Sequence, residues 1–566
     1  MKLNIDQIEI KTLKVGVIIN VIMAVCGWVF YSLTNSEALL LDGNFSFITA
    51  VSTFLAIFIV KEKHKKTVLF PYGNYFIMNL IFKITILVVL IFSPSHVMAQ
   101  ETNYWYQNFG AVSSLKGGIE AAGIDNPAAI YYNPGALAFM DGDYFDGQAD
   151  VISLNALNID NAGGKDVDLK LFQVDIAPSI FVFSRRLESN EKITFSVGVL
   201  TRVNQNYSFG LQHEQVGHYM LPNEDEEIFQ GDYKYENRIK EGWIMGAISY
   251  RINENIGLGM STNIFIRTQD YFKSYNARAF YKNEYQNNLP LSKLTSNSEE
   301  QKLNYRVMGF IFKPGINFDL EPVKLGLTLT TPSLSLGLLN NKSNRSQTSH
   351  LPDEAQKYYN ESNAHSFYSG MYKTPLSINL GAEYQFKKVS IGFSSEWFAK
   401  INKYNLIKEN SDSTNMMFPS GSNANYAIPV MANKSIINFG VSVVYDIKES
   451  LSYIGSVRTD FSYADTENLN TNTDFVPYIS DWDLYHVTSG FEFILKKASI
   501  TFGADYAYGH SNNKQQFVNM TNASQSNSLR GTIDNSASAN FHNLSLSIGL
   551  NIELTKGNKN KPNSYR

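Results

Sequence analysis

The feature that most constrains this chain is a series of long runs in which apolar and polar residues alternate one by one. In 376–386, for example, apolar residues occupy every even position, and polar residues or glycine occupy every odd position. The runs 389–402, 484–509 and 540–554 show a similar alternation. A period of two puts the two sets on opposite faces of a β-strand, so these runs predict strands rather than helices.

The strands predicted in this way are long enough to cross a membrane. Most runs have about ten residues or more, which a tilted strand needs to cross a bilayer. Short turns alternate strictly with long polar loops, and aromatic residues such as Trp397 and Tyr485 lie near the ends of the runs. A half-buried soluble sheet would also alternate, but it would not need these three features. The expected strands are 142–158, 171–187, 192–205, 240–252, 256–267, 304–319, 323–331, 376–386, 389–402, 435–447, 451–463, 483–495, 498–510 and 540–554.

The fold class that follows is an all-β membrane protein, a 14-stranded antiparallel transmembrane β-barrel over residues 142–554 with a C-terminal tail at 555–566. Closure of the sheet removes unpaired strand edges from lipid. An even number of strands returns both ends of the barrel to the same side, as in bacterial outer-membrane barrels. We expect a monomer in the outer membrane of a Gram-negative bacterium, in contact with the lipid bilayer and with the outer-membrane assembly machinery.

The composition excludes several kinds of partner and site. The chain has 48 basic and 52 acidic residues, without the basic surplus of a nucleic-acid-binding protein. Cys26 is the only cysteine in the 566 residues, so neither a disulfide framework nor a cysteine metal site can form. The sequence shows no pattern of a cofactor or metal site, and we expect neither.

The first hundred residues have a different character from the rest of the chain. Leu13 to Leu33 and Glu37 to Val60 are apolar stretches that are long enough to cross a bilayer as helices. Lysines precede the first stretch, and the basic segment 61–66 follows the second. Positive charge on both outer flanks predicts two transmembrane helices with both flanks in the cytoplasm.

Within this part, SEALLLDGNFSFI at 36–48 and FPYGNY at 70–75 resemble the start of the cation diffusion facilitator family. The resemblance places Asp42 on the first metal-ligand position, but Ser46 stands where the family has a second ligand. It implies that residues 1–77 are a fragment of a metal transporter, located in the inner membrane if they are translated. Divalent-cation transport is therefore an alternative function of the chain.

Residues 78–99 have the layout of a signal peptide. Met78 can serve as a start, Lys83 supplies the positive region, and an apolar core follows. Small residues precede the expected cleavage between Ala99 and Gln100. A third transmembrane helix is the alternative. An internal signal peptide implies either a gene-model error that joins neighbouring genes or a true fusion.

The segment 100–141, between the signal and the first strand, is predicted to be a plug. Its core, KGGIEAAGIDNPAAIYYNPGALAFM at 116–140, has two Asn-Pro pairs and many small residues but no strand alternation. Fourteen strands enclose more space than one layer of inward side chains fills. Asn side chains and proline-fixed turns can hold short helical pieces together inside that space. A periplasmic tail is the alternative.

This stretch resembles the N-terminal hatch of the FadL/TodX family of outer-membrane transporters. The resemblance implies a fourteen-stranded barrel that is closed by a hatch. It also implies passive transport of a hydrophobic small-molecule ligand, either a long-chain fatty acid or an aromatic hydrocarbon. The hatch motif falls on Asn126, Pro127, Ala128, Asn133, Pro134 and Gly135.

Ligand capture in that family takes place between extracellular loops, here expected at 268–303 and 332–375. The candidate ligand-binding residues lie near the base of the first loop, although aromatic residues there also suit an interfacial girdle. They are Tyr271, Phe272, Tyr275, Phe280 and Tyr281.

Two further classes of function stay open at this point. A hydrolytic barrel would need a serine, a histidine and an acid, and His486 and His510 are the histidines to consider. No residue marks a nucleophile, so we expect no catalytic residues and no enzyme. A structural or adhesive barrel would have no use for a plug.

Overall fold

The computed structural model describes residues 102–556, together with a few single positions between 14 and 46. Gaps in the first range lie at 124–125, 188, 221–224, 292, 338–340, 351–357, 363–368, 409–427 and 470–473. The chain divides into two compact units, Met1–Ser95 and His96–Arg566, and only the second is described in any length.

Most of what the sequence predicts for the N-terminal part lies outside the described residues. This holds for Asp42, for the signal segment 78–99 with Gln100, and for the stretch Glu37 to Val60 except Ser46, which is helical. Of the stretch Leu13 to Leu33 only single positions are described, and these are helical. Among the described residues, no helix has the length and apolar character needed to cross a bilayer.

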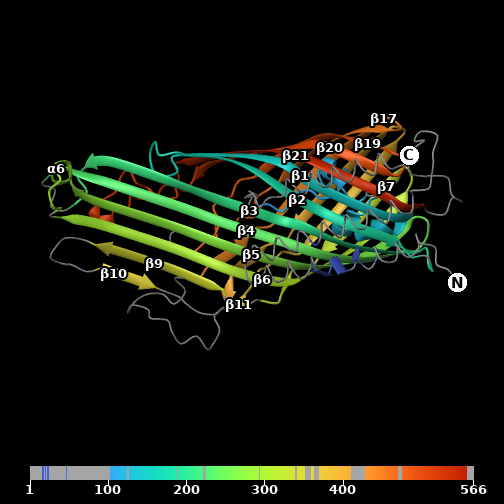
Figure 1. Ribbon diagram of the computed structural model, residues 1–566, viewed down its shortest axis with the longest axis horizontal. Coiled ribbons are helices and arrows are strands. Elements are labelled where there is room, and N and C mark those ends of the chain that lie inside the picture. The colour runs from blue at the N-terminus through green and yellow to red at the C-terminus, as the bar shows by residue number, and fades with distance from the viewer. Residues whose placement is uncertain are drawn as a thin grey trace. The chain divides into compact units, whose positions relative to one another are not determined.

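The second unit is built around a closed antiparallel barrel of fourteen strands, as predicted (Figure 1). Each strand pairs with its neighbours in the wall, β7 pairs with β12, and β21 pairs with β1 to close the ring. The wall strands are β1 Gly142–Asp160, β2 Leu169–Arg186, β3 Ile193–Gly217, β4 Glu227–Arg251, β5 Ile256–Tyr281, β6 Leu294–Leu320, β7 Val323–Thr330, β12 Ser377–Phe386, β13 Val389–Phe398, β17 Ile436–Lys448, β18 Leu451–Asp460, β19 Leu484–Ile494, β20 Ala498–Lys514 and β21 Ala537–Lys556.

Shorter elements complete the unit. The strand β9 pairs with the first part of β6, and β10 pairs with β9. The small strands are β8 Leu334–Ser335, β9 Lys342–His350, β10 Tyr358–Ser362, β11 Ser369–Gly370, β14 Ile401–Asn405, β15 Ile407–Lys408 and β16 Val430–Asn433. The short helices are α4 Ala111–Leu115, α5 Ala129–Tyr132, η1 Pro134–Phe139, α6 Lys282–Gln286 and η2 Gln525–Asn527.

The ends of the barrel differ, as the alternation of short turns and long loops predicts. We call the end with the short turns, where β1 begins and β21 finishes, the turn end, and the opposite end the loop end. The strands β3 to β6 have 25 to 27 residues and extend past the other strands toward α6 (Figure 1). The segments 206–239 and 268–303, expected as loops, are therefore mostly strand.

The outer surface of the barrel is apolar, and the inner surface carries the polar residues. Along β4, Ile244, Ile248 and Tyr250 face outward, whereas Ser249 and Glu241 are buried inside. This is the reverse of a soluble sheet. Large exposed apolar side chains on other strands include Phe195, Val197, Leu258, Met260, Leu325, Leu327, Leu380, Phe386, Ile391, Phe393, Ile437, Phe439, Val441, Val457, Val487, Phe491, Phe493, Phe502, Leu544 and Leu546. We call this surface the apolar belt.

The alternation changes phase where the long strands leave the apolar belt. On β5, Ile264 and Ile266 face outward, but further on Tyr271 and Tyr275 face inward and are buried. The pairing of β5 shows no register shift that could turn the strand over. Within the apolar belt, the apolar side chains of β5 face the barrel exterior. Further along the strand they face inward, because there they pack into a core between the strands and the loops.

Candidate functional site

The segment 102–141 lies against the inner wall of the barrel, where glycines make room for it. A Cβ atom on Gly326 of β7 would lie 1.6 Å from the carbonyl oxygen of Ala121, and one on Gly259 of β5 would lie 2.2 Å from that of Pro134. Real side chains do not tolerate such distances, so the glycines allow the backbones to touch. Ala111, Leu115, Ala129 and Leu137 are among the buried residues of this segment. We call the segment the hatch segment.

Both Asn-Pro pairs fix turns in the hatch segment. Asn126 Oδ1 accepts a hydrogen bond from the backbone N–H of Ala128 (2.9 Å), and Asn133 Oδ1 accepts one from Gly135 (3.0 Å). Each asparagine thus caps the turn that its proline begins, since the fixed φ of proline suits a first helical position. The hatch motif residues therefore shape the plug itself, and they do not line the cavity described below.

Asn133 also ties the hatch segment to the wall. Its Nδ2 donates to the carbonyl oxygens of Ala121 (2.7 Å) and of Ile316 on β6 (3.0 Å). The side chain is completely buried, so these hydrogen bonds have no water to replace them. One residue thereby holds together two parts of the hatch segment and one wall strand.

A buried ion cluster joins the hatch segment to β12. Lys116 Nζ lies 2.8 Å from Glu120 and 2.8 Å from Glu383 Oε2, and it also donates to the carbonyl oxygen of Gly123 (2.9 Å). Burial alone would lower the pKa of Lys116, but the two carboxylates hold its pKa well above the ordinary value. Lys116 is therefore charged at every physiological pH, and the cluster is a permanent ionic contact.

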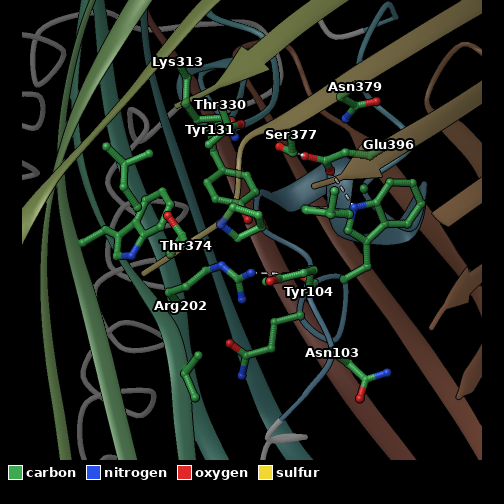
Figure 2. A pocket seen from close by; sticks show the side chains of 18 of the residues that line it. Asn103, Tyr104, Tyr131, Arg202, Lys313, Thr330, Thr374, Ser377, Asn379 and Glu396 are labelled. Carbon is green, nitrogen blue, oxygen red and sulfur yellow. Dashed lines mark hydrogen bonds between the residues drawn. The ribbon is translucent and has the colours of Figure 1, made fainter. Parts of the chain in front are cut away.

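A cavity lies inside the barrel, between the hatch segment and the wall strands (Figure 2). The space open to the centre of a water molecule is about 100 Å³. The lining combines aromatic rings with charged groups from five strands, β3, β4, β5, β6 and β13. It includes Asn103, Tyr104, Trp105, Tyr131 and Tyr132 of the hatch segment, and Arg202, Val203, Glu241, Trp243, Arg267, Ile311, Lys313, Thr328, Thr330, Tyr372, Ser377, Asn379, Glu396, Phe398 and Tyr463 of the remainder.

Two of the charged groups in the cavity neutralise each other. Arg267 Nη1 lies 2.7 Å from Glu241 Oε2, and both side chains are buried. Glu241 Oε1 accepts a further hydrogen bond from Trp243 Nε1 (2.8 Å), and the guanidinium of Arg267 lies 4.2 Å from the ring centre of Tyr372. The charges of this pair are thus matched within the protein, although Arg267 Nε has no hydrogen-bond partner among the described residues.

The other two cations have no such partner. Arg202 Nη2 donates to the carbonyl oxygen of Tyr104 (2.8 Å), and Lys313 Nζ donates to that of Tyr131 and lies 4.3 Å from its ring centre. Across the described residues, neither cation has a carboxylate oxygen within 4.0 Å. Both remain able to bind an anion that enters the cavity.

The remaining acid of the cavity is held away from these cations. Glu396 accepts hydrogen bonds from Trp105 Nε1 (2.7 Å) and from Ser377 Oγ (2.6 Å), as Figure 2 shows on the far side of the cavity from Arg202. Burial raises the pKa of the Tyr131 phenol, so this group is neutral between the cations. The cavity therefore has a cationic side, an acidic side and aromatic walls.

The wall beside the cavity is incompletely paired. The strands β2 and β3 pair only from Arg186–Thr194 to Ile180–Leu200, near the turn end. Beyond this point β2 pairs with β1 alone and β3 with β4 alone, and β3 has a bulge between Thr201 and Val203. Arg202 and Val203 line the cavity directly after the last pair.

The five aromatic residues expected near the loop base lie on β5, and none of them lines this cavity. Tyr271 packs against Tyr235 and Phe475, and the hydroxyl of Tyr275 donates to the carbonyl oxygen of Leu529 (2.7 Å). Phe280 and Tyr281 are buried near α6. Phe272 faces outward, between Lys234 and Lys302.

The two histidines considered for hydrolysis lie in different surroundings. His486 is buried on β19, where Nδ1 lies 2.8 Å from Arg458 and 3.0 Å from Asp505. His510 is exposed, and its Nδ1 lies 2.8 Å from Asn540 Oδ1. In the described part of the chain, no cluster of acids and histidines is arranged to hold a metal ion.

Sequence reasoning did not single out Arg202 and Lys313. Both lie at inward positions of strands that also carry serine, asparagine and threonine inward, so the period-two pattern treats them as ordinary lumen residues. A strongly cationic side chain among small neutral lumen residues is the signal that could have identified them.

The barrel resembles solved structures of outer-membrane channels at low sequence identity. The toluene transporter TodX of Pseudomonas putida is 12% identical with a TM-score of 0.48, over 81% of this chain and 100% of that chain. A FadL homologue of Pseudomonas aeruginosa is 15% identical with a TM-score of 0.46, over 81% of this chain and 100% of that chain. The monoaromatic hydrocarbon channel CymD is 11% identical with a TM-score of 0.44, over 79% and 97%.

The N-terminal part matches a different family. The cation efflux transmembrane domain matches residues 13–100, whereas no curated protein matches the chain. The family match covers the residues that resemble a cation transporter and extends over the segment 78–99.

Proposed function

We propose that this protein is an outer-membrane channel for passive uptake of hydrophobic molecules with an acidic head group, such as long-chain fatty acids. The apolar belt and the closed sheet support a place in a bilayer, where only helices and closed barrels satisfy every backbone group. Short turns at one end and long polar loops at the other support an orientation with the loops outside the cell.

The single observation that carries the choice of ligand is the pair of cations in the cavity. A carboxylate head group would satisfy both Arg202 and Lys313 through charge-assisted hydrogen bonds. A neutral hydrocarbon would bury the same cations without an anionic partner, which is costly. Of the two ligand classes that the hatch motif implies, the fatty acid therefore suits this cavity better. The aromatic walls would contact the first part of its chain.

The incomplete wall supports a sideways exit. The strands β2 and β3 stop pairing after Leu200, and the next residues, Arg202 and Val203, belong to the cavity. A ligand whose head group lies at Arg202 would be next to unpaired wall. In this proposal the hatch segment closes the straight route through the lumen and directs the ligand to the side.

Binding of oleate and of its neutral methyl ester to the purified full-length protein in detergent tests the proposal. We expect oleate to bind at least tenfold more tightly than the ester, because one hydrogen bond to a charged group contributes about 1.5–3 kcal/mol. The variants Arg202→Gln and Lys313→Met should each lose about tenfold or more in oleate affinity and leave ester affinity nearly unchanged.

Two exposed cations at the turn end provide matched controls. Lys388 and Arg185 lie outside the cavity, and Lys388→Met and Arg185→Gln should bind oleate as the unchanged protein does. Equal affinity for oleate and the ester, with no effect of either cavity variant, would remove the acidic head group from the proposal. Absence of binding of both would remove the proposal as a whole.

Transport of divalent cations is a second candidate function, supported by the match of residues 13–100 to the cation efflux transmembrane domain. Zinc uptake by cells that express the full chain is compared with uptake by cells that express a version starting at Met78. Activity of the full chain alone would support this second function, and equal uptake would exclude it.

A further inference from the structure

The apolar belt on β4, β5 and β6 ends along a level row of residues. The last row of the belt consists of Gly242 on β4, Ile266 on β5 and Met308 on β6, which are paired in register. The register then pairs Lys240 with Thr268 and Thr268 with Arg306, so these three residues form the first row above the belt.

The second row, one step further from the belt, is also basic. Arg238 pairs with Asp270, Asp270 with Asn304, and Asn304 with Lys342 on β9. The side chain of Asn304 donates to Asp270. The two rows together contain four cations and a single carboxylate. We call the cations Arg238, Lys240, Arg306 and Lys342 the basic rim.

The next two rows, Glu236–Phe272–Lys302 and Lys234–Ser274–Glu300, have a balanced charge. Lys234 lies 3.0 Å from Glu236, and Lys302 lies 2.9 Å from Glu300. Both lysines also lie near the ring of Phe272, at 5.7 Å and 5.3 Å from its centre. The outer face of the long strands therefore has three zones: apolar side chains, then two rows with four cations and one carboxylate, then two rows with balanced charge and an aromatic ring.

Other strands end differently at the same side of the barrel. Trp397 on β13, Tyr485 on β19 and Tyr508 on β20 face outward near the loop end, and His542 on β21 lies beside Tyr508. These are aromatic and uncharged or weakly basic groups, as in an interfacial girdle. Over the described residues, the basic rim is thus a feature of β4, β6 and β9, on either side of β5.

We propose that the basic rim binds the phosphate groups of a phosphorylated glycolipid in the outer leaflet. The order of the three zones matches the order of such a lipid: acyl chains against the apolar belt, phosphates against the cations, and sugars against the polar and aromatic zone. Arginine and lysine at the edge of a hydrocarbon layer are suited to phosphate, arginine through paired N–H donors. The inference rests on the proposed place of the barrel in an outer membrane, and it goes beyond ligand uptake.

The test uses full-length protein freed of native lipid and titrated with lipid A that carries two phosphates, with native mass spectrometry or calorimetry as the readout. The triple variant Arg238→Gln, Lys240→Gln and Arg306→Gln should bind about tenfold more weakly or worse, because each cation near a lipid surface adds to the attraction. Enzymatically dephosphorylated lipid A should lose a similar factor on the unchanged protein. Lys342→Gln alone should cause a smaller loss in the same direction.

The control triple variant is Lys387→Gln, Lys388→Gln and Lys496→Gln, which removes three cations near short turns at the opposite end. It should bind lipid A as the unchanged protein does. Equal binding of the phosphorylated and dephosphorylated lipids, or equal binding by the rim variant, would overturn the proposal. Equally tight binding of phosphatidylglycerol would also overturn the proposal, because the site would then bind any anionic lipid and would not select a phosphorylated glycolipid.

These outcomes are separable from those for ligand uptake. The rim variant keeps Arg202 and Lys313, so its affinity for oleate should equal that of the unchanged protein. Unchanged oleate binding also demonstrates that the variant is folded. If oleate does not bind to any version, the uptake proposal fails, and the lipid A measurement stands by itself.

Discussion

Lys116 in the hatch segment and Glu383 on β12 form an ion pair of 2.8 Å inside the barrel, although 267 positions separate them in the sequence. Both side chains are buried, and Glu120 completes the cluster. A buried charge that loses its partner is strongly destabilised, so this contact fixes where the hatch segment lies. Any movement that opens the lumen must break it or carry β12 along.

Removal of one partner should loosen the hatch segment. We expect Lys116→Met to cost about 3–5 kcal/mol of unfolding free energy, because it leaves two buried carboxylates without the cation that balances their charge. Urea unfolding in detergent and protease sensitivity of residues 102–141 measure the effect. The exposed pair of Lys282 and Glu226 is the control, since Lys282→Met should change neither readout. A loss no larger than that of the control contradicts a structural role of the cluster.

The pH dependence of this contact has a definite sign. The folded pKa of Lys116 is raised above its ordinary value, so its stabilising effect is complete below the unfolded pKa, about 10.4, and is lost only at higher pH. The difference in unfolding free energy between the unchanged protein and Lys116→Met should thus be constant from pH 7 to 9.5. A difference that shrinks within this range would contradict the assignment of Lys116 as the charge that holds the hatch segment.

The close approach at Gly326 predicts a steric effect. Gly326→Ala would place a Cβ 1.6 Å from the carbonyl oxygen of Ala121, so the hatch segment must shift, at a cost of about 1–3 kcal/mol or more. Gly246→Ala on β4 is the control, because a Cβ there meets no atom within 4 Å. Thermal unfolding distinguishes the two variants. Equal stability of both would mean that the hatch segment does not touch β7 in solution.

Asn133 should matter more as a donor than as a helix cap. Asn133→Asp keeps the oxygen that accepts from Gly135 but loses the donors to Ala121 and Ile316, so it should destabilise the protein almost as much as Asn133→Ala, by about 1–3 kcal/mol. Asn287→Ala, on an exposed side chain after α6, is the control and should have little effect. Full stability of the aspartate variant, measured by thermal unfolding, would assign the role of Asn133 to capping alone.

The period-two pattern predicts the number of strands and their closure, because the fourteen segments turn their apolar sides outward and together form the apolar belt. The pattern fails where the apolar belt ends. In β5 the unbroken series of outward apolar residues ends at Ile266, and the inward ones then include Tyr271 and Tyr275. The pattern changes phase there without a turn, so the sequence predicts a loop where the strand in fact continues.

The site shows a similar division. The Asn-Pro pairs were recognisable, because their turns are local and depend on neighbouring residues. The position of Lys116 opposite Glu383 and of Arg202 near Lys313 depends on the register of distant strands and on the path of the hatch segment. A single sequence contains neither. These charged residues come together only after the barrel has closed around the hatch segment.

Uptake of radiolabelled oleate is the most direct test of the central claim that this barrel passes hydrophobic acids across an outer membrane. The host is a Gram-negative strain without its own fatty-acid channel, and the outer-membrane amount of each version is matched by immunoblot. We predict uptake well above that of the empty vector for the unchanged protein, and uptake close to the vector for the variant that combines Arg202→Gln with Lys313→Met. Uptake by the unchanged protein at the level of the vector, with folded protein present in the outer membrane, would contradict the account.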